Sequence, residues 1–479
     1  MFNSLHEECG VFGIFDNKTS DVANLVYLGL HALQHRGQES CGIAVNNDGV
    51  FSHYKGDGLA SEVFSAEKLS GLGQGNMALG HVRYSTTGGK DINNIQPLVI
   101  RHIKGNLALA HNGNLTNSEE IRRGIELSGG IFHGTSDTEA IAYSLVKNRL
   151  ISSNTPEAVE KTMHAIKGAY SCVIMTATAL IAFRDPNGFR PLCIGKTAGG
   201  AYCVASESCA LDAVGAELIR DVRPGEIVVF SKEGMKSLSS HCTAKENTSM
   251  CIFEFIYFAR PDSVIDGCSV NRARMNAGMY LAREHPVDAD IVIGVPDSGL
   301  DAALGYSKES GIPYGVGFIK NKYTGRSFIQ PSQQQRENTV KLKLNAIKET
   351  VNGKRVIMVD DSIVRGTTCA GIIRLLRNAG AKEVHMRVSS PAFRNPCYFG
   401  TDIDSRDKLI ACKYDSPAEI AKVIGADSLG YLSVDAVHKI AEGSSVCFCD
   451  GCFTGTYPIP VPKETAKNKF DRKMGYYNE

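Results

Sequence analysis

The sequence predicts two domains of different fold class. At 479 residues the chain is too long for one ordinary hydrophobic core. Up to about residue 240, short β-like runs alternate with turns rich in Gly, Asn and Asp. After about residue 250, strand-like and helix-like segments alternate regularly. We therefore predict an α+β layered domain over residues 9–245 and an α/β domain with a parallel sheet over residues 246–479.

The first domain is predicted to contain many strands and few helices. Its clearest strand signals are VFGIF, GIAVNN, MALGHVRYS, LALAHNGNL, YSCVIMT, LIAFRD, AYCVAS and EIVVF. Helices are predicted at about 21–34, 138–150 and 156–167. Pro156 suits the first turn of the last helix, because the N–H that proline lacks would have no partner there. Strands that outnumber the helices packed against them are typical of a layered α+β domain.

The second domain shows the pattern of a doubly wound parallel sheet. Hydrophobic strands are predicted at 290–296, 355–361 and 383–390, with helices at about 299–310 and 367–379 between them. The stretch between residues 237 and 250 is polar and weakly patterned, and we place the domain boundary there.

Charge and composition exclude several classes of protein. Lys and Arg total 52 against 51 Asp and Glu, a balance that does not support nucleic acid as a partner. The longest apolar run, at 172–183, is too short to span a membrane and reads as a buried strand pair. The first residues lack the basic and apolar regions of a secretory signal, so a cytoplasmic protein is expected. In that compartment the 15 cysteines do not indicate a disulfide framework, but some can bind metal.

A candidate nucleophile, Cys9, stands close to the start of the chain. If a short leader were removed, the thiol would gain its own base, because a free α-amine has a pKa near ~8 against ~8.5 for a thiol. Nucleophile and base would then belong to one residue. The alternative interpretation of Cys9 alone is a small buried residue with no chemical role.

Four later strings supply groups that such a thiol needs. They are QHRGQES (34–40), GHVRYSTTG (80–88), AHNGNLTN (110–117) and GTSDTE (134–139). Arg83 can bind a carboxylate in a fork, and Asp137 can pair with an ammonium group. Asn112 and the backbone N–H of Gly113 can form an oxyanion hole. Taken singly, Arg83 and Asp137 read as surface charges, and Asn112-Gly113 reads as a turn.

Together, the five strings resemble the glutaminase domain of the N-terminal-nucleophile amidotransferases. The resemblance implies a four-layer sandwich, in which two antiparallel sheets lie between helical layers. It implies that residues 1–8 are a propeptide whose removal frees Cys9 as the catalytic nucleophile. Asn112 and Gly113 would stabilise the tetrahedral intermediate. The residues implied to bind glutamine are Arg36, Gly37, Arg83 and Asp137.

The clearest motif of the second domain is RVIMVDDSIVRGTT at 355–368. A buried strand ends at Asp360 and Asp361, the carboxyl edge where open α/β sheets bind ligands. A loop of small and hydroxyl residues follows and leads into a helix, an arrangement suited to a phosphate. The two carboxylates can hold ribose hydroxyls or a hydrated Mg²⁺. The alternative is an ordinary strand–loop–helix crossover with a polar turn.

This motif resembles the fingerprint of the type I phosphoribosyltransferases, whose substrate is phosphoribosyl pyrophosphate (PRPP). The resemblance implies that PRPP is bound by Ser362, Arg365, Gly366, Thr367 and Thr368. It also implies Mg²⁺ beside Ser298, Asp360 and Asp361. The polar run at 320–336 would be a flexible lid over PRPP, and its Tyr323 would help to form an ammonia channel. Without the resemblance, that run reads as a solvated surface loop.

Cysteines near the C-terminus are candidates for metal binding. Cys449 and Cys452 form a C-x-x-C, which alone could indicate zinc, a redox pair or chance. Both halves in this order resemble the glutamine PRPP amidotransferase family, of which one subgroup carries a [4Fe–4S] cluster. The implied ligands are Cys251, Cys397, Cys449 and Cys452, with Cys447 as an extra thiol.

The same resemblance implies the overall reaction. Glutamine is hydrolysed at Cys9, and the ammonia displaces pyrophosphate from PRPP to give 5-phosphoribosylamine, the first step of de novo purine synthesis. Purine nucleotides as feedback inhibitors and a homo-oligomer, tetramer or dimer, are implied as well. One rival is another amidotransferase with this glutaminase, but its sugar-isomerase half would lack the Asp360-Asp361 loop. The other is a PRPP-sensing regulator, which would carry a DNA-binding module instead of a glutaminase.

Overall fold

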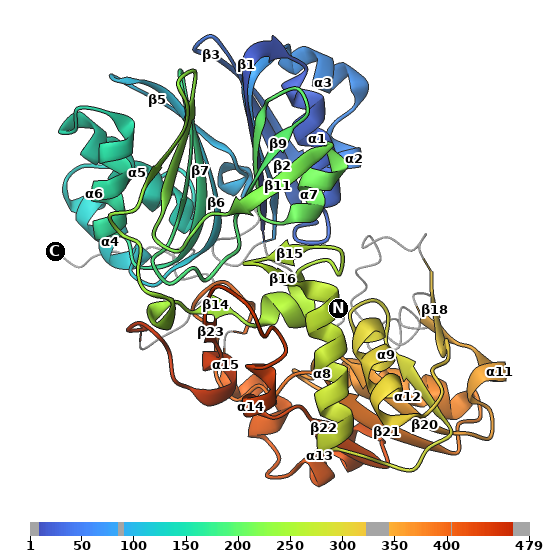
Figure 1. Cartoon of the computed structure of the whole chain (residues 1–479). Coiled ribbons are helices and arrows are strands. Elements are labelled where there is room, and N and C mark those ends of the chain that lie inside the picture. Colours follow the sequence, from blue (N-terminus) through green and yellow to red (C-terminus); the bar gives the residue numbers. More distant parts are fainter. Residues whose placement is uncertain (1–8, 85–90, 322–343, 404, 463–479) are drawn as a thin grey trace.

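The computed structural model describes residues 9–84, 91–321, 344–403 and 405–462. The predicted propeptide, residues 1–8, and Tyr323 lie outside the described residues, as does most of the predicted lid. The described chain forms an upper and a lower half in Figure 1, which correspond to the two predicted domains.

The first half is built on two antiparallel sheets. One sheet has the order β11-β9-β10-β1-β4-β2-β3, and the other has the order β13-β12-β8-β7-β6-β5. The strands of the first sheet are β1 (Gly10–Ser20), β2 (Ser40–Asn47), β3 (Val50–Asp57), β4 (Gly75–Arg83), β9 (Cys193–Thr197), β10 (Tyr202–Ala205) and β11 (Ala216–Asp221). Those of the second are β5 (Leu98–His102), β6 (Gly105–Leu115), β7 (Gly168–Thr176), β8 (Leu180–Arg184), β12 (Ile227–Ser231) and β13 (Gly234–Leu238).

Helices cover the outer face of each sheet, as Figure 1 shows. The first sheet is covered by α1 (Val22–Ala32), α2 (Ala60–Val63), α3 (Ala66–Leu72) and α7 (Ser208–Ala213). The second is covered by α4 (Ser118–Leu127), α5 (Asp137–Leu150) and α6 (Thr155–Ala165). The predicted four-layer sandwich is confirmed. The predicted strand pair at 172–183 is the antiparallel pair β7 and β8.

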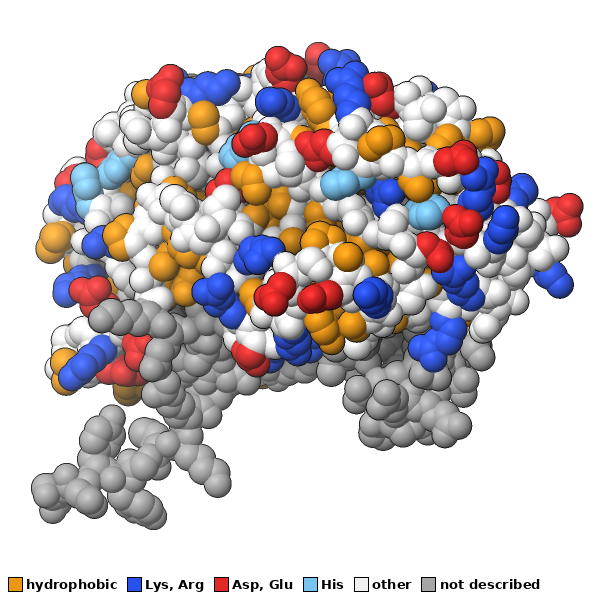
Figure 2. Space-filling view, turned by 90° about the horizontal axis from the view of Figure 1, so that it is seen from below, with side chains coloured by type: hydrophobic (Ala, Val, Ile, Leu, Met, Phe, Trp, Pro, Cys, Tyr) orange, Lys and Arg blue, Asp and Glu red, His pale blue; other side chains and the backbone are white. Residues whose placement is uncertain are grey.

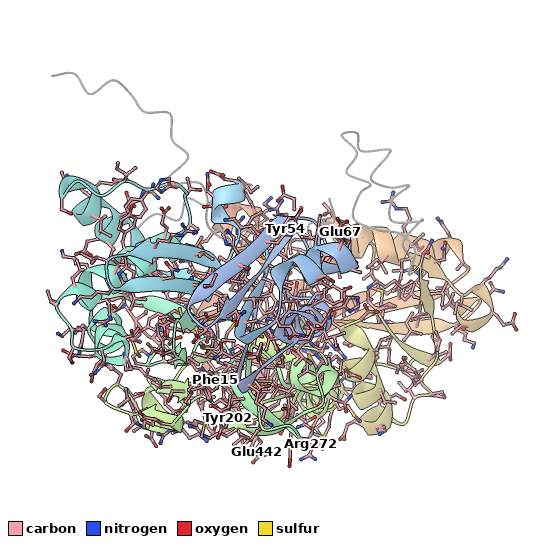
Figure 3. The ribbon with its side chains drawn as sticks, turned by 90° about the horizontal axis from the view of Figure 1, so that it is seen from above. Phe15, Tyr54, Glu67, Tyr202, Arg272 and Glu442 are labelled. Carbon is pink, nitrogen blue, oxygen red and sulfur yellow. The ribbon has the colours of Figure 1, made fainter. Side chains whose placement is uncertain are left out.

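The core of this half lies between the two sheets. Val11 and Phe15 of β1 pack there with Ala108 and Ala110 of β6. Phe15 pairs in register with Tyr202 of the neighbouring strand β10, and Figure 3 labels both residues. Because side chains alternate between the faces of a strand, the core also fixes which residues beyond each strand end face inward.

The second half contains the predicted parallel sheet, in the order β17-β20-β21-β22. Its strands are β17 (Ile291–Gly294), β20 (Arg355–Asp360), β21 (Glu383–Val388) and β22 (Ser428–Tyr431). Its helices are α8 (Val270–Glu284), α9 (Gly299–Ser310), α11 (Lys348–Val351), α12 (Thr367–Asn378), α13 (Pro417–Ile424), α14 (Val434–Val437) and α15 (Gly451–Thr454). Three short two-stranded pairs complete it: β14 (Met250–Cys251) with β23 (Phe448–Cys449), β15 (Val264–Ile265) with β16 (Cys268–Ser269), and β18 (Phe318–Lys320) with β19 (Leu344–Ala346).

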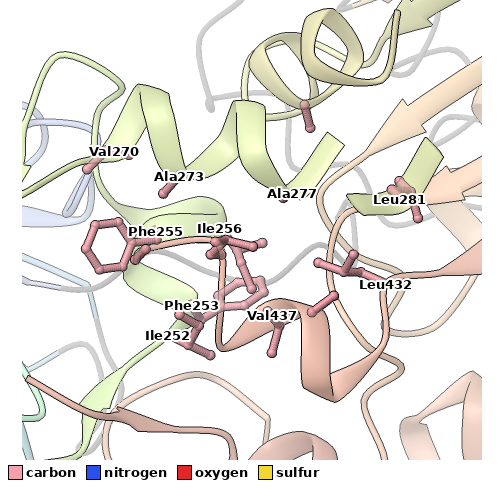
Figure 4. Packing of buried hydrophobic residues seen from close by; sticks show 14 of the residues in the cluster. Ile252, Phe253, Phe255, Ile256, Val270, Ala273, Ala277, Leu281, Leu432 and Val437 are labelled. Atoms are coloured by element: carbon pink, nitrogen blue, oxygen red, sulfur yellow. The ribbon is translucent and has the colours of Figure 1, made fainter. Parts of the chain in front are cut away.

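Helix α8 was not predicted from the sequence, although it is 15 residues long. Polar residues interrupt the apolar pattern of its sequence. The residues on its inner face are mainly small, such as Ala273, Ala277 and Gly278, and small residues give a weak helix signal. Figure 4 shows Ala273, Ala277 and Leu281 of α8 above Ile256 and Val437, in one hydrophobic cluster. The cluster joins the segment after the domain boundary to the end of the chain.

The last described segment returns to the start of the second domain. Strand β14 pairs in parallel with β23, so that Met250 lies opposite Phe448 and Cys251 opposite Cys449. The predicted boundary at residue 245 falls between the end of β13 and β14.

On the face shown in Figure 2, basic and acidic side chains are interspersed rather than gathered by sign. None of the helices in the described part of the chain combines the length and the apolar character needed to cross a bilayer.

Candidate functional site

Cys9 lies directly before β1, at the end of the first sheet. It is buried, and its Sγ donates a hydrogen bond to the carbonyl oxygen of Tyr84 at 3.4 Å. The adjacent Gly10 pairs with Val82 of β4, so Arg83, the last residue of that strand, lies at the same end. Arg83 is 4% exposed, so its interpretation as a surface charge is wrong.

The oxyanion candidates belong to the other sheet. Asn112 and Gly113 lie within β6, so the reading of this pair as a turn is wrong. The Nδ2 of Asn112 is buried and has no hydrogen-bond partner among the described residues. A buried amide without a partner is costly, so it indicates a donor kept for another molecule. Gly113 has φ of 138°, and a Cβ there would lie 2.2 Å from the carbonyl oxygen of Ala169.

A buried histidine brings the two sheets together at this end. The Nε2 of His81 in β4 lies 3.1 Å from the carbonyl oxygen of His111, the residue before Asn112. Burial lowers the pKa of His81 to about 3, so its ring is neutral. Since Val82 also pairs beside Cys9, the nucleophile and the oxyanion candidates are at the same end of the sandwich. Val11 and Ala110 face the core between the two sheets. Cys9 is two residues before Val11 and Asn112 is two residues after Ala110, so both side chains are expected on the same inner faces.

Asp137 begins helix α5 and is 5% exposed, so it is not a surface charge either. Its Oδ2 accepts a hydrogen bond from the backbone N–H of Leu115 at 2.8 Å. Its Oδ1 lies 3.7 Å from Nδ1 of His111. The carboxylate is therefore oriented by the end of β6, the strand that carries Asn112 and Gly113.

The loop with Arg36 and Gly37 packs against the end of β4. A Cβ at Gly37 would lie 2.6 Å from the carbonyl carbon of Val82, so only glycine fits. The Nε of Arg36 donates to the carbonyl oxygen of Cys9 at 3.1 Å, and its other nitrogens bond Glu207 and Glu254. The glutamine-binding role of Arg36 and Gly37 stays a prediction, but the structure places both beside the nucleophile.

Sequence reasoning missed several residues that support this end of the sandwich. His111 was inside a quoted string, yet only its neighbours were singled out. Its backbone N–H donates to Oε1 of Gln96, and its Nδ1 lies 3.2 Å from Oγ1 of Thr138. Glu207 lies in no motif, and Glu254 lies in FEFIYFARPDS (253–263), a string that matches the family but in which no residue was singled out.

A second site lies at the carboxyl end of β20. Ser298, which directly precedes α9, and Ser362 both donate their hydroxyls to the carboxylate of Asp361. Burial raises the pKa of Asp361, and burial together with repulsion by Asp361 raises the pKa of Asp360 well above its usual range. Asp361 is buried and Asp360 is half-buried. These two repelling carboxylates, with hydroxyls beside them, provide the hard oxygen donors that Mg²⁺ prefers. The predicted residues therefore fit the ion.

The loop after these carboxylates ends at Gly366, which caps α12 with φ of 81°. Thr367 and Thr368 form the first turn of the helix, whose unpaired backbone N–H groups suit an anion. Arg365 is exposed beside them. The predicted phosphate loop thus has the expected strand–loop–helix context, and phosphate binding stays a prediction.

The four candidate cluster ligands come from distant parts of the chain and are neighbours. Cys251 lies opposite Cys449. Cys397 and Cys452 pack against the hydrophobic cluster that contains Cys251, and Cys397 and Cys449 pack against the cluster of Ala169, Phe189 and Phe399. Burial and then the charges of Cys397, Cys251 and Cys449 raise the pKa of Cys452 well above its usual range. As placed, no group of three or more His, Cys, Asp or Glu among the described residues is arranged to hold a metal ion. Four neighbouring thiols fit the donor chemistry of an iron–sulfur cluster, and its binding stays a prediction.

Comparison with known proteins finds similarity over nearly the whole chain. Residues 81–213 match the glutamine amidotransferase domain family, and residues 274–398 match the phosphoribosyl transferase domain family. An amidophosphoribosyltransferase of Methanocaldococcus jannaschii is 47% identical over 470 residues, which cover 95% of this chain and 98% of the relative. That of Bacillus subtilis is 47% identical over 466 residues, which cover 96% of each protein.

Two solved structures have the same fold. One, the allosteric regulatory enzyme of purine biosynthesis, has a TM-score of 0.89 at 46% identity and covers 97% of this chain and 99% of its own. The other, glutamine PRPP amidotransferase of B. subtilis complexed with ADP and GMP, has a TM-score of 0.88 at 46% identity. It covers 96% of this chain and 99% of its own.

Proposed function

This chain belongs to the amidophosphoribosyltransferase family, and on that premise we propose how its residues divide the reaction between two sites. The chain is a glutamine-dependent pentosyltransferase of purine biosynthesis. It converts glutamine and PRPP into 5-phosphoribosylamine, glutamate and pyrophosphate. The PRPP-sensing regulator is thereby excluded, and so is an amidotransferase with a sugar-isomerase half.

At the first site, Cys9 attacks the side-chain amide of glutamine after residues 1–8 are removed. The freed α-amine of Cys9 takes the proton of the thiol and passes it to the departing ammonia. The oxygen of the tetrahedral intermediate is held by Nδ2 of Asn112 and the backbone N–H of Gly113. Ammonia leaves a thioester, and water then releases glutamate.

Glutamine is held by the charged groups around Cys9. Arg83 pairs with its α-carboxylate and Asp137 with its α-ammonium, while Arg36 and Gly37 form the adjacent loop. Burial of Arg83 and Asp137 supports these roles, because two buried charges of opposite sign suit a zwitterionic substrate.

At the second site, ammonia displaces pyrophosphate from C1 of PRPP. The loop of Ser362, Arg365, Gly366, Thr367 and Thr368 binds the 5-phosphate through its N–H and hydroxyl groups. Asp360, Asp361 and Ser298 hold Mg²⁺, which neutralises the charge of the leaving pyrophosphate when bound. Tyr323 belongs to the lid that forms the ammonia channel.

Four further properties complete the proposal. A [4Fe–4S] cluster is bound by Cys251, Cys397, Cys449 and Cys452. Purine nucleotides inhibit the enzyme, as the ADP and GMP bound to the B. subtilis relative suggest. The chain assembles as a homo-oligomer. It works in the cytoplasm, which agrees with 15 cysteines that form no disulfide in the described chain.

The observation that supports the glutaminase assignment best is the unpartnered Nδ2 of Asn112 at the end of the sandwich where Cys9 lies. We expect Cys9→Ala to abolish glutamine-dependent synthesis and to leave synthesis from added ammonia near the wild-type rate, because only the thiol is lost. Pyrophosphate release measured with each nitrogen donor tests this. Loss of both activities in a folded variant would contradict two separate sites.

A further inference from the structure

A buried network of charged side chains joins the two domains behind Cys9. It consists of Arg36 between α1 and β2, Arg190 before β9, Glu207 before α7, and Glu254 at the start of a π-helical turn of the second domain. All four side chains are 0% exposed. Two cations and two anions balance one another, so the network can stay charged without water.

Arg36 is the centre of this network. Its Nη1 donates to Glu207 at 2.6 Å and to Glu254 at 2.9 Å, and its Nη2 donates to Glu254 at 2.8 Å. The guanidinium is therefore fixed in a two-pronged bond by Glu254. This orients Nε, which donates to the carbonyl oxygen of Cys9 at 3.1 Å.

Both carboxylates that hold Arg36 are themselves held by the second domain or belong to it. Oε2 of Glu207 accepts from the backbone N–H of Arg260 at 2.9 Å and from the hydroxyl of Ser263 at 2.7 Å. Glu254 accepts from Nη1 of Arg190 at 3.1 Å. The position of the Cys9 carbonyl thus depends on the docked second domain.

This contact matters because of where Cys9 stands in the mature chain. As the first residue it has no preceding peptide, so its only covalent link to the chain is the bond to Gly10, and noncovalent contacts must hold its α-amine and thiol in place. A hydrogen bond on the Cys9 carbonyl fixes that peptide plane and the groups before it. A nucleophile held in its reactive orientation avoids the entropy cost of finding it.

We propose that Glu254 is a positioning residue for the glutaminase reaction, supplied by the phosphoribosyltransferase domain and acting on Cys9 through Arg36. The proposal rests on the proposed role of Cys9 as nucleophile. It extends that role, because the thiol is then fully ordered only when the second domain is docked. Through the contacts of Glu254 with Arg36 and of Arg36 with Cys9, a conformational change in the phosphoribosyltransferase domain would alter the position of Cys9 in the glutaminase domain.

The test is Glu254→Gln in the full chain. The side chain keeps its shape but turns an amide N–H₂ toward the Arg36 guanidinium, so one prong is lost. We expect kcat for glutamine hydrolysis to fall about tenfold or more, from the loss of one buried charge-assisted hydrogen bond. KM for glutamine and ammonia-dependent synthesis are expected to stay within about twofold, because neither depends on the Cys9 carbonyl. Alkylation of Cys9 by iodoacetamide should slow in parallel.

Asp266→Asn provides the matched control. Asp266 belongs to the second domain and forms a buried two-pronged pair with Arg184 of β8, at 2.9 and 2.8 Å. This pair crosses the same domain interface without touching Cys9. Asp266→Asn should therefore leave kcat for glutamine hydrolysis near the wild-type value.

Three outcomes would overturn the proposal: wild-type glutaminase kcat in Glu254→Gln, an equal loss of ammonia-dependent synthesis, or the same loss in Asp266→Asn. If Glu254→Gln does not fold, Glu254→Asp keeps the charge but shortens the reach to Arg36. The same selective loss of kcat is then expected, and wild-type kcat would overturn the proposal. Ammonia-dependent synthesis by the wild type checks the proposed function independently of either variant.

Discussion

At the residue scale, single atoms at strand ends decide the chemistry of both sites. The Nδ2 of Asn112 is buried and has no hydrogen-bond partner in the described part of the chain, and the buried carboxylate of Asp361 lies beside the half-buried carboxylate of Asp360. Both arrangements cost free energy in the unliganded protein. Each arrangement therefore supports the ligand proposed for it, an oxyanion at Asn112 and a cation at the two aspartates.

Gly113→Ala should disable the glutaminase. The added Cβ would lie 2.2 Å from the carbonyl oxygen of Ala169 at φ of 138°, so the backbone N–H must move. Loss of one oxyanion donor lowers kcat by about 100- to 1,000-fold. Gly105→Ala is the control, because Gly105 begins the same strand with φ of 116° and open space around it. Glutaminase assays of both variants check this, and equal activities would contradict the role of Gly113.

Asp361→Asn should impair the second site selectively. The carboxamide accepts a hydrogen bond from only one of Ser298 and Ser362 and loses the charge that Mg²⁺ needs, so apparent metal affinity should fall about 10- to 100-fold. Synthesis from glutamine and from ammonia should fall together, and glutamine hydrolysis should not. Mg²⁺ titrations of PRPP turnover measure this. Asp290→Asn, at the opposite end of the neighbouring strand, is the control, and an unchanged kcat/KM for PRPP in Asp361→Asn would refute the assignment.

At the scale of elements, short pairings hold the ends of the second domain together. Strands β14 and β23 have two residues each, yet they join segments almost 200 residues apart. So small a pair is marginal by itself. It is reinforced by the hydrophobic cluster under α8 and by the neighbouring cysteines.

Removal of one cluster ligand should weaken this junction. We expect Cys→Ser at 251, 397, 449 or 452 to lower iron content and the yield of folded protein, because cluster binding contributes to folding free energy. Cys447→Ser, next to β23 but outside the proposed set, should do neither. Iron and sulfide analysis of protein purified without oxygen checks this. Zinc, or fully active protein without metal, would refute the cluster and leave the enzyme assignment intact.

At the scale of the whole molecule, buried ion pairs connect the two domains. Arg184 of the first domain forms a two-pronged pair with Asp266 of the second. Asp221 lies beside them, and its Oδ1 has no hydrogen-bond partner among the described residues. Burial and then repulsion by Asp266 raise the pKa of Asp221 to about 7.

This shift predicts how stability depends on pH. The folded protein binds a proton at Asp221 more tightly than the unfolded chain, whose aspartate pKa is near ~3.9. The stabilisation that proton binding at Asp221 gives to the folded protein is therefore complete below the aspartate pKa of the unfolded chain. It is lost as the pH rises through about 7, the pKa of Asp221 in the folded protein.

Asp221→Asn should remove this pH dependence. We expect its thermal midpoint to exceed that of the wild type by about 2–4 °C more near pH 8 than near pH 4, which corresponds to about 1 kcal/mol of stability lost by the wild type over that range. Calorimetry at the two pH values checks this. An equal difference between variant and wild type at both values would contradict the assignment of the proton to Asp221.

Much of the fold and most of the proposed site could be predicted because their signals are local. Helices α5 and α12 were predicted to within about one residue of their ends, since segments rich in Gly, Ser or Asn border both of them in the sequence. Helix α8 was missed, because its small, mixed residues become an inner face only when the end of the chain packs on them. The burial of Arg83 and Asp137 also escaped prediction, because charge gives no sign of what will cover it.

The sequence by itself determined the residue types and the order of the chemistry: a cysteine near the start, an Asn-Gly pair, and two aspartates before a small-residue loop. Each is a short string whose function depends on neighbours within a few residues. Only the tertiary structure decided that Arg36 is held by Glu254, 218 residues away, and that its Nε supports Cys9. Such a contact leaves no local pattern, because a buried ion pair requires only that two distant charges be covered together.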